Sequence, residues 1–382
     1  MKIGILTHPL LGNYGGMIQA YALVKILRNL GHDARNLAFL PLPLPNFWRA
    51  PIQHLRQRLQ LGERLRVFRL MCSPAPAGTK VPRILNIMHG CRFQHQYVPY
   101  CRIGDSPTDQ LIEHGIEAIV VGSDQVWRDI YARSMKSLPF FFLDFAPEEI
   151  RCRSIAYAAS FGSDTWGGTD GETEICRSLL QDFKAVSVRE SSGVNICRNI
   201  FEKEALHVLD PTMLLDAEDY DTLIASKPGR DTEAPFICTY LLDQTSEISD
   251  AVSCISRKLN LPLEPLQAEP QFARKKHRFP ISVARWLRGI RHCQYLITDS
   301  FHGCVFAIIF NKPFVCLGNK DRGAARFESL LSTFGLQDRL VIKQNAEAIQ
   351  QILNTRVDWD KVNAIRQKER ERALHFLKEN LR

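Results

Sequence analysis

Residues 3–31 read IGILTHPLLGNYGGMIQAYALVKILRNLG. The apolar run Ile3 to Thr7 predicts a buried strand, and the glycine-rich segment Gly12 to Gly16 predicts a loop. The periodic apolar residues from Met17 to Leu30 predict a helix that ends at Gly31. A strand, a loop and a helix in this order are typical of the start of a doubly wound α/β domain.

The same alternation recurs along the chain, where short apolar runs are followed by polar or glycine-bearing turns and helical stretches. Ser246–Leu259 and Ser282–Arg291 are predicted helices, and Val357–Leu381 predicts a long amphipathic terminal helix. Parallel sheets with helices on both faces are the simplest explanation of this pattern. The further strands are predicted at Ala118–Val121, Ser154–Ala158, Ala185–Val188, His207–Leu209, Phe236–Leu242, Tyr295–Thr298 and Phe314–Leu317.

The division into domains follows from one polar segment. Ser226 to Pro235 contains proline and glycine, lacks apolar periodicity and is the predicted linker. We therefore expect two Rossmann-like domains, at residues 1–225 and 226–345, and C-terminal helices at 346–382 that can cross back to the first domain. Two such domains facing each other would hold a ligand in a cleft, where strand carboxyl ends and helix amino termini converge.

The composition limits the kinds of partner. Of 382 residues, 49 are Lys or Arg and 41 are Asp or Glu, so the net charge of +8 favours anionic partners. No sustained basic tract with interleaved aromatic residues is present, so nucleic acid is not an expected partner. The 11 cysteines lack close Cys-x-x-Cys pairs and zinc spacing, so we expect reduced thiols, a cytoplasmic protein and no metal site.

Two further observations concern membranes. Neither a signal peptide nor a membrane-spanning helix is predicted from the sequence. Ile52–Met71 alternates apolar residues with arginines, which fits a basic surface lying against acidic lipid, or packing against the body of the protein. Peripheral contact with the inner face of a membrane is therefore one expectation, and the sequence predicts no oligomeric state.

The strongest local motif is TDSFHG at residues 298–303, between a predicted strand and an apolar helix. Ser300, Phe301 and His302 would lie on the strand-to-helix turn, where backbone N–H groups and the helix dipole attract anions. His302 adds a proton donor or a positive charge, and Ser300 adds a hydroxyl. The alternative is that Ser300 only caps the helix and His302 is a satisfied core histidine.

A second motif is VGSDQVW at residues 121–127, where an apolar strand runs into a small polar turn. Gly122 permits close approach of a ligand, and Asp124 would stand at the strand's carboxyl end as a base for a sugar hydroxyl. Trp127 would stack on a sugar face. The alternative is a Ser/Asp helix cap with Trp127 in the core.

A third candidate is Arg189, which follows the predicted strand Ala185–Val188. Its planar guanidinium suits a carboxylate or a phosphate, and an ion pair with Glu190 or another acid is the alternative. The NYGG turn at Asn13–Gly16 is a candidate phosphate or substrate loop without the spacing of the dinucleotide fingerprint or the P-loop. Asp210 is assigned no chemistry, because Pro211 forces it into an extended turn.

Six segments of the chain together resemble the polysaccharide pyruvyl transferase family. They occur in order over roughly residues 1–340, so the joint resemblance is more specific than any single motif. The segments are Ile3–Leu30, Val121–Trp127, Ala156–Gly162, Ser187–Glu190, Leu209–Thr212 and Thr298–Phe314.

The resemblance implies an α/β protein with two Rossmann-like domains of the glycosyltransferase-B type, the first on the acceptor side and the second on the donor side. It implies transfer of a pyruvyl group from phosphoenolpyruvate to a sugar of a surface polysaccharide or of its lipid-linked precursor. The products are a pyruvate ketal and phosphate. Phosphoenolpyruvate is then a co-substrate, and no cofactor is expected.

The resemblance also implies site residues. An arginine matching Arg189 and a histidine matching His302 bind the donor in the family. For the chemistry of transfer we expect His302 to contact the phosphate or act as general acid, and Asp124 to act as general base or to position the acceptor. Some members have an arginine where Ser300 stands here, so another arginine replaces its charge or the donor differs. The predicted donor site is Arg189, Ser300, Phe301, His302, Gly303, Arg322 and Arg326, and the predicted acceptor site is Asn13, Tyr14, Gly15, Gly16, Ser123, Gln125 and Trp127.

Two other functions are also compatible with the sequence. A glycosyltransferase that uses a nucleotide sugar would share the two-domain fold and a helix amino terminus for the diphosphate. A catalytically silent glycan-binding protein of polysaccharide assembly would keep the cleft without performing transfer.

Overall fold

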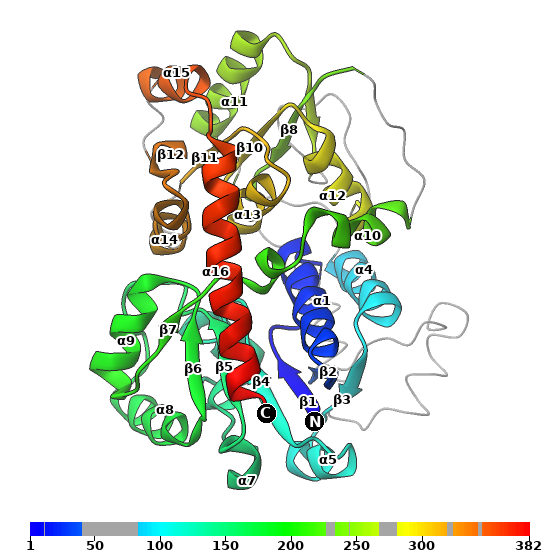
Figure 1. Cartoon of the computed structure of the whole chain (residues 1–382), viewed down its shortest axis with the longest axis vertical. Helices are drawn as coiled ribbons and strands as arrows, with labels where there is room; N and C mark the ends of the chain where they lie inside the picture. The colour runs from blue at the N-terminus through cyan, green and yellow to red at the C-terminus, as the bar shows by residue number, and fades with distance from the viewer. Residues whose placement is uncertain are drawn as a thin grey trace. The chain divides into compact units, whose positions relative to one another are not determined.

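The computed structural model describes residues 1–10, 12–39, 83–226, 234–243, 245–266, 281–318, 324–342 and 346–382. They form two compact α/β units, whose elements are labelled in Figure 1. Unit 1 holds the described residues of Met1–Ser73, Ile87–Leu214 and Glu369–Arg382, and unit 2 those of Pro74–Asn86 and Leu215–Lys368. Most of the predicted linker, all of Ile52–Met71 and Arg322 lie outside the described residues.

The sheet of unit 1 is parallel. Its described strands are β1 (Lys2–Leu6), β2 (Asp33–Ala38), β3 (Tyr100–Arg102), β4 (Ala118–Val121), β5 (Ile155–Ala159), β6 (Ala185–Val188) and β7 (Leu206–His207), in the order β3-β2-β1-β4-β5-β6-β7. β1 pairs with β2 on one side and with β4 on the other, so the strand order reverses between β1 and β4. Such a switch point leaves a crevice outside the strand carboxyl ends, where ligands of doubly wound folds bind.

The helices of unit 1 are α1 (Tyr14–Asn29), α4 (Arg83–Tyr97), α5 (Pro107–Glu113), α6 (Asp129–Met135), α7 (Glu148–Arg151), α8 (Asp170–Asp182) and α9 (Ser191–Phe201), with the 3₁₀ helices η1 (Pro139–Phe142) and η2 (Pro211–Leu214). The helix α1 begins at Tyr14, before the predicted start at Met17. The predicted loop at Gly12–Gly16 is therefore wrong in its second part, because Gly15 and Gly16 form the first helical turn. Glycine is compatible with loops and helix ends alike, so the sequence did not separate the two.

The central strands of unit 1 are continuous apolar runs because both faces of the sheet are buried. Every residue of β4 and β5 is buried. On one face, Leu6 and Val121 belong to the same core as Phe142. On the other, the ring of Tyr157 contacts that of Phe376 on α16 (Trp359–Asn380). The part of α16 from Glu369 onward belongs to unit 1, and its start belongs to unit 2.

Unit 2 repeats the plan with a parallel sheet in the order β12-β11-β10-β8-β9 among its described strands. The strand order reverses between β8 and β10, and β10 leads directly into α13. The strands predicted around residues 236–242, 295–298 and 314–317 are confirmed. The elements are η3 (Ala217–Tyr220), α10 (Asp221–Ala225), β8 (Ile237–Tyr240), α11 (Ser246–Leu259), β9 (Leu263–Pro265), α12 (Val283–His292), β10 (Tyr295–Thr298), α13 (Phe301–Ile309), β11 (Phe314–Leu317), α14 (Ala324–Phe334), η5 (Gln337–Arg339), β12 (Leu340–Val341) and α15 (Ala346–Asn354).

Gly122, directly after β4, is a position where only glycine fits. Its φ is +119°, and an added Cβ atom would lie 2.3 Å from the carbonyl oxygen of Tyr157. We expect Gly122→Ala to lower the free energy of unfolding by about 2 kcal/mol or more, because both the conformation and the contact exclude a side chain. Urea denaturation followed by circular dichroism measures the change. Gly171→Ala is the control, since no atom lies within 4 Å of its added Cβ; equal losses in both variants would contradict the argument.

Candidate functional site

The switch point of unit 1 gathers polar residues from the carboxyl ends of neighbouring strands. His8 follows β1, Ser123 and Asp124 follow β4, and Arg189 follows β6. The Oγ1 atom of Thr7, also after β1, donates a hydrogen bond of 2.8 Å to the carbonyl oxygen of Ser123. The loops that follow β1 and β4 are therefore joined at the point where the fold places its crevice.

Arg189 lies at the centre of this cluster, and its side chain is only 1% exposed. Its Nη1 atom donates to Asp210 Oδ2 at 2.9 Å, and its Nη2 atom donates to Asp124 Oδ1 at 3.3 Å. Burial acts to lower the pKa of the guanidinium, but the carboxylates of Asp124, Asp210 and Glu190 outweigh it and the pKa is raised. Arg189 is therefore a buried, charged arginine that pairs with carboxylates of the protein. Such an ion pair is the alternative that the sequence left open.

Asp210 completes the cluster from the segment after β7. Its Oδ2 atom accepts the hydroxyl of Ser123 at 3.1 Å, and its Oδ1 atom accepts both the N–H of Thr212 at 3.0 Å and the hydroxyl of Thr212 at 2.7 Å. Sequence reasoning assigned Asp210 no chemistry. Its position could have identified it, because Asp210 follows β7, which pairs with the strand that precedes Arg189. A buried arginine at this edge of the sheet requires a nearby negative charge.

Asp124 has a positive φ of 76° and is 4% exposed. Besides Arg189, its Oδ1 atom accepts the backbone N–H of Gln125 at 2.9 Å. Asp124, the predicted general base or acceptor-positioning residue, is therefore held in an ion pair with Arg189.

The amino terminus of α1 lies beside Asp124. A Cβ atom added at Gly16 would lie 3.5 Å from Asp124 Oδ2 and 3.4 Å from the side-chain nitrogen of Asn13. The predicted acceptor residues Asn13, Tyr14, Gly15 and Gly16 thus come together with Asp124 at the switch point. A negative carboxylate at a helix amino terminus is also electrostatically favourable.

Trp127 does not present its ring to a ligand in this structure. It is 1% exposed, its indole N–H donates to the carbonyl oxygen of Phe141 at 3.1 Å, and its ring stacks on that of Phe142 at 4.9 Å. The ring of Phe161 lies 5.1 Å away. The core interpretation of Trp127 therefore replaces the predicted sugar contact, because neighbouring aromatic rings and a backbone carbonyl already occupy its surface.

His8, which the sequence analysis does not single out, also lies at the switch point. It is 9% exposed, and its ring lies edge-on to those of Tyr131 at 6.0 Å and Phe141 at 5.7 Å. Burial lowers the pKa of His8 below its ordinary value of 6.5, opposed by the charge of Asp124 and by a hydrogen bond with the Gln125 backbone and assisted by the charge of Arg189. A polar residue just beyond β1 at a switch point was the available signal.

The predicted donor motif lies at the amino terminus of α13 in unit 2. Ser300 caps this helix, since its hydroxyl accepts the N–H of Gly303. An added Cβ at Gly303 would lie 2.2 Å from Thr298 Oγ1, so glycine lets the helix pack onto the end of β10. His302 is 6% exposed on the first helical turn. The cap role of Ser300 is shown, and His302 stands where an anion at this helix end would be contacted.

Arg326 is a further basic residue near this helix end. It is 8% exposed, and its guanidinium carbon lies 5.9 Å from the ring centres of both Phe301 and Phe327. The ring of Phe301 in turn contacts that of His302 at 5.4 Å. Unit 2 therefore brings Arg326 to the predicted donor residues 300–303. Arg189 lies in unit 1.

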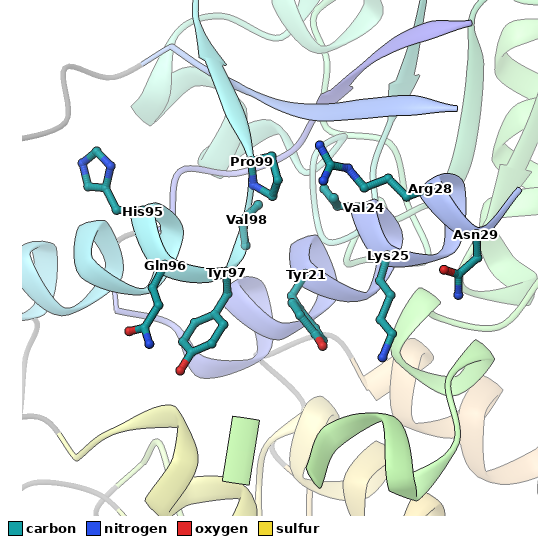
Figure 2. Close-up of a pocket in the computed structure, with 10 residues that line it drawn as sticks. All are labelled: Tyr21, Val24, Lys25, Arg28, Asn29, His95, Gln96, Tyr97, Val98 and Pro99. Carbon is teal, nitrogen blue, oxygen red and sulfur yellow. The ribbon is translucent and has the colours of Figure 1, made fainter. Parts of the chain in front are cut away.

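Unit 1 also has a surface pocket of about 340 Å³ between α1 and the end of α4 (Figure 2). The side chains of Tyr21, Lys25, Gln96 and Tyr97 point to the same side in this view. None of the predicted site residues lines it. The lining residues are Tyr21, Val24, Lys25, Arg28, Asn29, His95, Gln96, Tyr97, Val98 and Pro99.

Neither a metal-binding cluster nor a membrane-spanning helix is found among the described residues. No group of three or more His, Cys, Asp or Glu side chains is arranged to hold a metal ion within the part of the chain that the structure describes. Across those same residues, no helix has both the length and the apolar character that crossing a bilayer requires.

Comparison with protein families assigns the sequence. The family model described as polysaccharide pyruvyl transferase matches residues 13–321. The chain belongs to this family. The match includes both units and every predicted site residue up to Gly303, so the resemblance seen in the sequence is confirmed, and membership makes the chain an enzyme of polysaccharide pyruvyl transfer.

Solved structures show the fold of this family member. A protein of Listeria monocytogenes described as a UDP-N-acetylglucosamine 2-epimerase has a TM-score of 0.52 at 11% identity, covering 98% of this chain and 95% of its own. The UDP-GlcNAc 2-epimerase of Neisseria meningitidis bound to UDP-GlcNAc has a TM-score of 0.51 at 11% identity, covering 100% and 99%. At this identity the likeness shows the fold alone, and it confirms two Rossmann-like domains of the glycosyltransferase-B type. Comparison with curated proteins gives no match.

The buried Arg189 pairs predict a strong effect on stability. We expect Arg189→Met to lower the free energy of unfolding by about 3–5 kcal/mol, because Asp210 and Asp124 lose a buried cation. The double variant Arg189→Met/Asp210→Asn should recover part of this loss, since it also removes a buried negative charge. Urea unfolding of the three proteins measures it, and wild-type stability of Arg189→Met would show that the ion pairs contribute little.

The lowered pKa of His8 predicts a loss of stability in acid. The unfolded chain binds a proton near pH 6.5 and the folded chain only at lower pH, so His8 costs stability as the pH falls from about 6.5 towards the folded pKa. Replacing it by glutamine removes this contribution. Unfolding free energies at pH 7.5 and 5.5 should therefore differ less for His8→Gln than for the wild type. An equal or larger difference in the variant would contradict the assignment.

Proposed function

We propose that this family member transfers the pyruvyl group of phosphoenolpyruvate to a sugar of a surface polysaccharide or its precursor, forming a pyruvate ketal and releasing phosphate. The family match over residues 13–321 is the observation that carries the proposal. The chemistry of the α13 amino terminus supports phosphoenolpyruvate as the donor. The acceptor is a free or lipid-linked glycan, the reaction takes place in the cytoplasm, and no nucleic acid takes part.

The donor requires positive charge. Phosphoenolpyruvate carries a carboxylate and a phosphate of about −1.5 to −2 charge, and such groups bind to arginine and to helix amino termini. The first turn of α13 supplies N–H groups, and His302 supplies an imidazole. The guanidinium of Arg326 lies over the ring of Phe301, the residue before His302. We therefore propose that Arg326 supplies the positive charge that an arginine supplies in some family members at the position of Ser300.

The reaction needs a proton donor and a proton acceptor. Protonation of the methylene carbon gives an oxocarbenium-like centre, which one sugar hydroxyl attacks; phosphate then leaves and a second hydroxyl closes the ketal. In our proposal His302 contacts the phosphate and protonates it as it leaves. Asp124, paired with Arg189, orients the acceptor side of unit 1 rather than accepting the proton.

The alternatives give different products. A nucleotide-sugar glycosyltransferase would release a nucleotide, and a glycan-binding protein would release nothing. The purified chain should be mixed with phosphoenolpyruvate and a panel of free and lipid-linked glycans, and the release of inorganic phosphate and the mass of each glycan should be followed. The proposal predicts phosphate release that depends on a glycan, together with the mass gain of one ketal per transfer.

Variants of unit 2 test the donor site. We expect His302→Ala to abolish phosphate release and Arg326→Ala to raise the KM for phosphoenolpyruvate roughly tenfold or more, since a charge-assisted hydrogen bond is lost. Arg326→Lys should lie between Arg326→Ala and the wild type. Arg198→Ala is the control, because Arg198 is an exposed arginine paired with Glu204. Donor KM values unchanged by both Arg326 substitutions would remove this residue from the donor site.

A further inference from the structure

Tyr131, on α6, is an exposed aromatic residue whose ring contacts that of His8 at the switch point. It is 37% exposed, whereas Trp127, one helical turn earlier in the chain, is 1% exposed. The guanidinium of Arg128 lies over the Tyr131 ring at 4.8 Å, and the ring of His8 meets it edge-on at 6.0 Å. The ring of Tyr131 therefore lies near the carboxyl ends of β1 and β4, close to the position at which the sequence predicted the ring of Trp127.

One nitrogen of the His8 imidazole is unsatisfied. Among the described residues, Nε2 of His8 has no hydrogen-bond partner although it is buried. The backbone of Gln125 acts on the same ring as a hydrogen-bond partner that favours its protonated form. A ligand hydroxyl hydrogen-bonded to Nε2 would satisfy this buried polar atom.

Local contacts hold these groups in place. Nη1 of Arg128 donates to Oε1 of Gln125 at 2.9 Å. A Cβ atom added at Gly162, in the loop after β5, would lie 2.3 Å from Gln125 Oε1 and 2.9 Å from Arg128 Cδ. The loop therefore packs directly against the pair, and Gln125, Arg128, Tyr131 and His8 form a connected group within unit 1.

This combination has the chemistry of a carbohydrate site. An aromatic ring packs against the C–H groups of a pyranose, while an arginine and an imidazole beside it bind hydroxyls. We propose that His8, Arg128 and Tyr131 form the acceptor-sugar subsite within unit 1. The inference rests on the proposed function, of which it defines the acceptor side.

The proton transfers balance over the reaction. Each sugar hydroxyl loses its proton as its oxygen bonds to the pyruvyl carbon, and the bond from that carbon to the phosphate oxygen breaks. Of the two protons released, one ends on the methylene carbon, which becomes a methyl group, and the other on the departing phosphate. The two protons lost by the hydroxyls equal the two gained, and no oxidant or reductant is consumed.

Binding without the donor tests the subsite separately from the reaction. Methyl glucoside, galactoside and mannoside can be used as probes in saturation-transfer NMR with the full chain. We expect at least one to bind the wild type, Tyr131→Ala to weaken that binding roughly tenfold, and Tyr131→Phe to retain it. Ile130→Ala is the matched control, because Ile130 is 63% exposed on the same helix.

Kinetics then test the subsite during the reaction. With phosphoenolpyruvate and an active glycan, Tyr131→Ala should raise the KM for the glycan and leave the KM for phosphoenolpyruvate unchanged. His8→Gln and His8→Asn should also raise the KM for the glycan, because they remove the imidazole of the subsite. Circular dichroism identifies any His8 variant that fails to fold, and in that case the Tyr131 variants decide the question.

Each outcome decides for or against the subsite. Equal glycoside binding by the wild type and Tyr131→Ala, or no binding of any probe to the wild type, overturns it. Binding lost in Tyr21→Ala but kept in Tyr131→Ala would place the glycan in the pocket of Figure 2 and overturns it too. Tyr131-dependent binding without turnover of phosphoenolpyruvate supports the subsite and contradicts the proposed reaction.

Discussion

The buried ion pairs of Arg189 with Asp210 and Asp124 hold together the carboxyl ends of the unit 1 strands. The three residues come from segments far apart in sequence, after β6, β7 and β4, and Ser123 joins them through Asp210. An arginine that is 1% exposed can remain charged only if carboxylates compensate its desolvation. This constraint fixes the positions of Asp124, Gln125 and the start of α1.

The same ion pairs engage the charge of Arg189, a predicted donor residue, within unit 1. Its positive charge is shared between the carboxylates of Asp210 and Asp124. Our proposals use the amino terminus of α13 with His302 and Arg326 for the donor, and His8, Arg128 and Tyr131 for the acceptor sugar.

Most of the fold could be predicted from the sequence, because its central strands are buried on both faces and show as apolar runs. The strands β1, β4, β5, β6, β8, β10 and β11 were predicted for this reason. The strand β2 was not, since Asp33–Ala38 mixes charged and apolar residues, and β3, β9 and β12 are too short to give a period. The helix α1 extends back to Tyr14 because Gly15 and Gly16 do not prevent a helical first turn.

The sequence indicated several of the residues at the switch point, but not the interactions that they make. Asp124 and Arg189 were identified because they follow apolar strands, yet the ion pair between them depends on strand order, which one-dimensional patterns do not contain. Trp127 was predicted to stack on a sugar but lies in the core, because the exposure of a ring depends on its neighbours, here Phe142 and Phe161. His8 was not predicted because it belongs to no motif. It comes close to Asp124 and Gln125 only because β4 pairs with β1.

The most direct test of the account follows the pyruvyl carbon itself. Phosphoenolpyruvate labelled isotopically at its enol carbon should be incubated with the enzyme and a glycan acceptor, and the label followed by carbon NMR. The account predicts that the labelled carbon becomes a ketal carbon bonded to two oxygens of one sugar, with one phosphate released for each. A labelled carbon that stays in phosphoenolpyruvate, or leaves as free pyruvate, with every acceptor would contradict it.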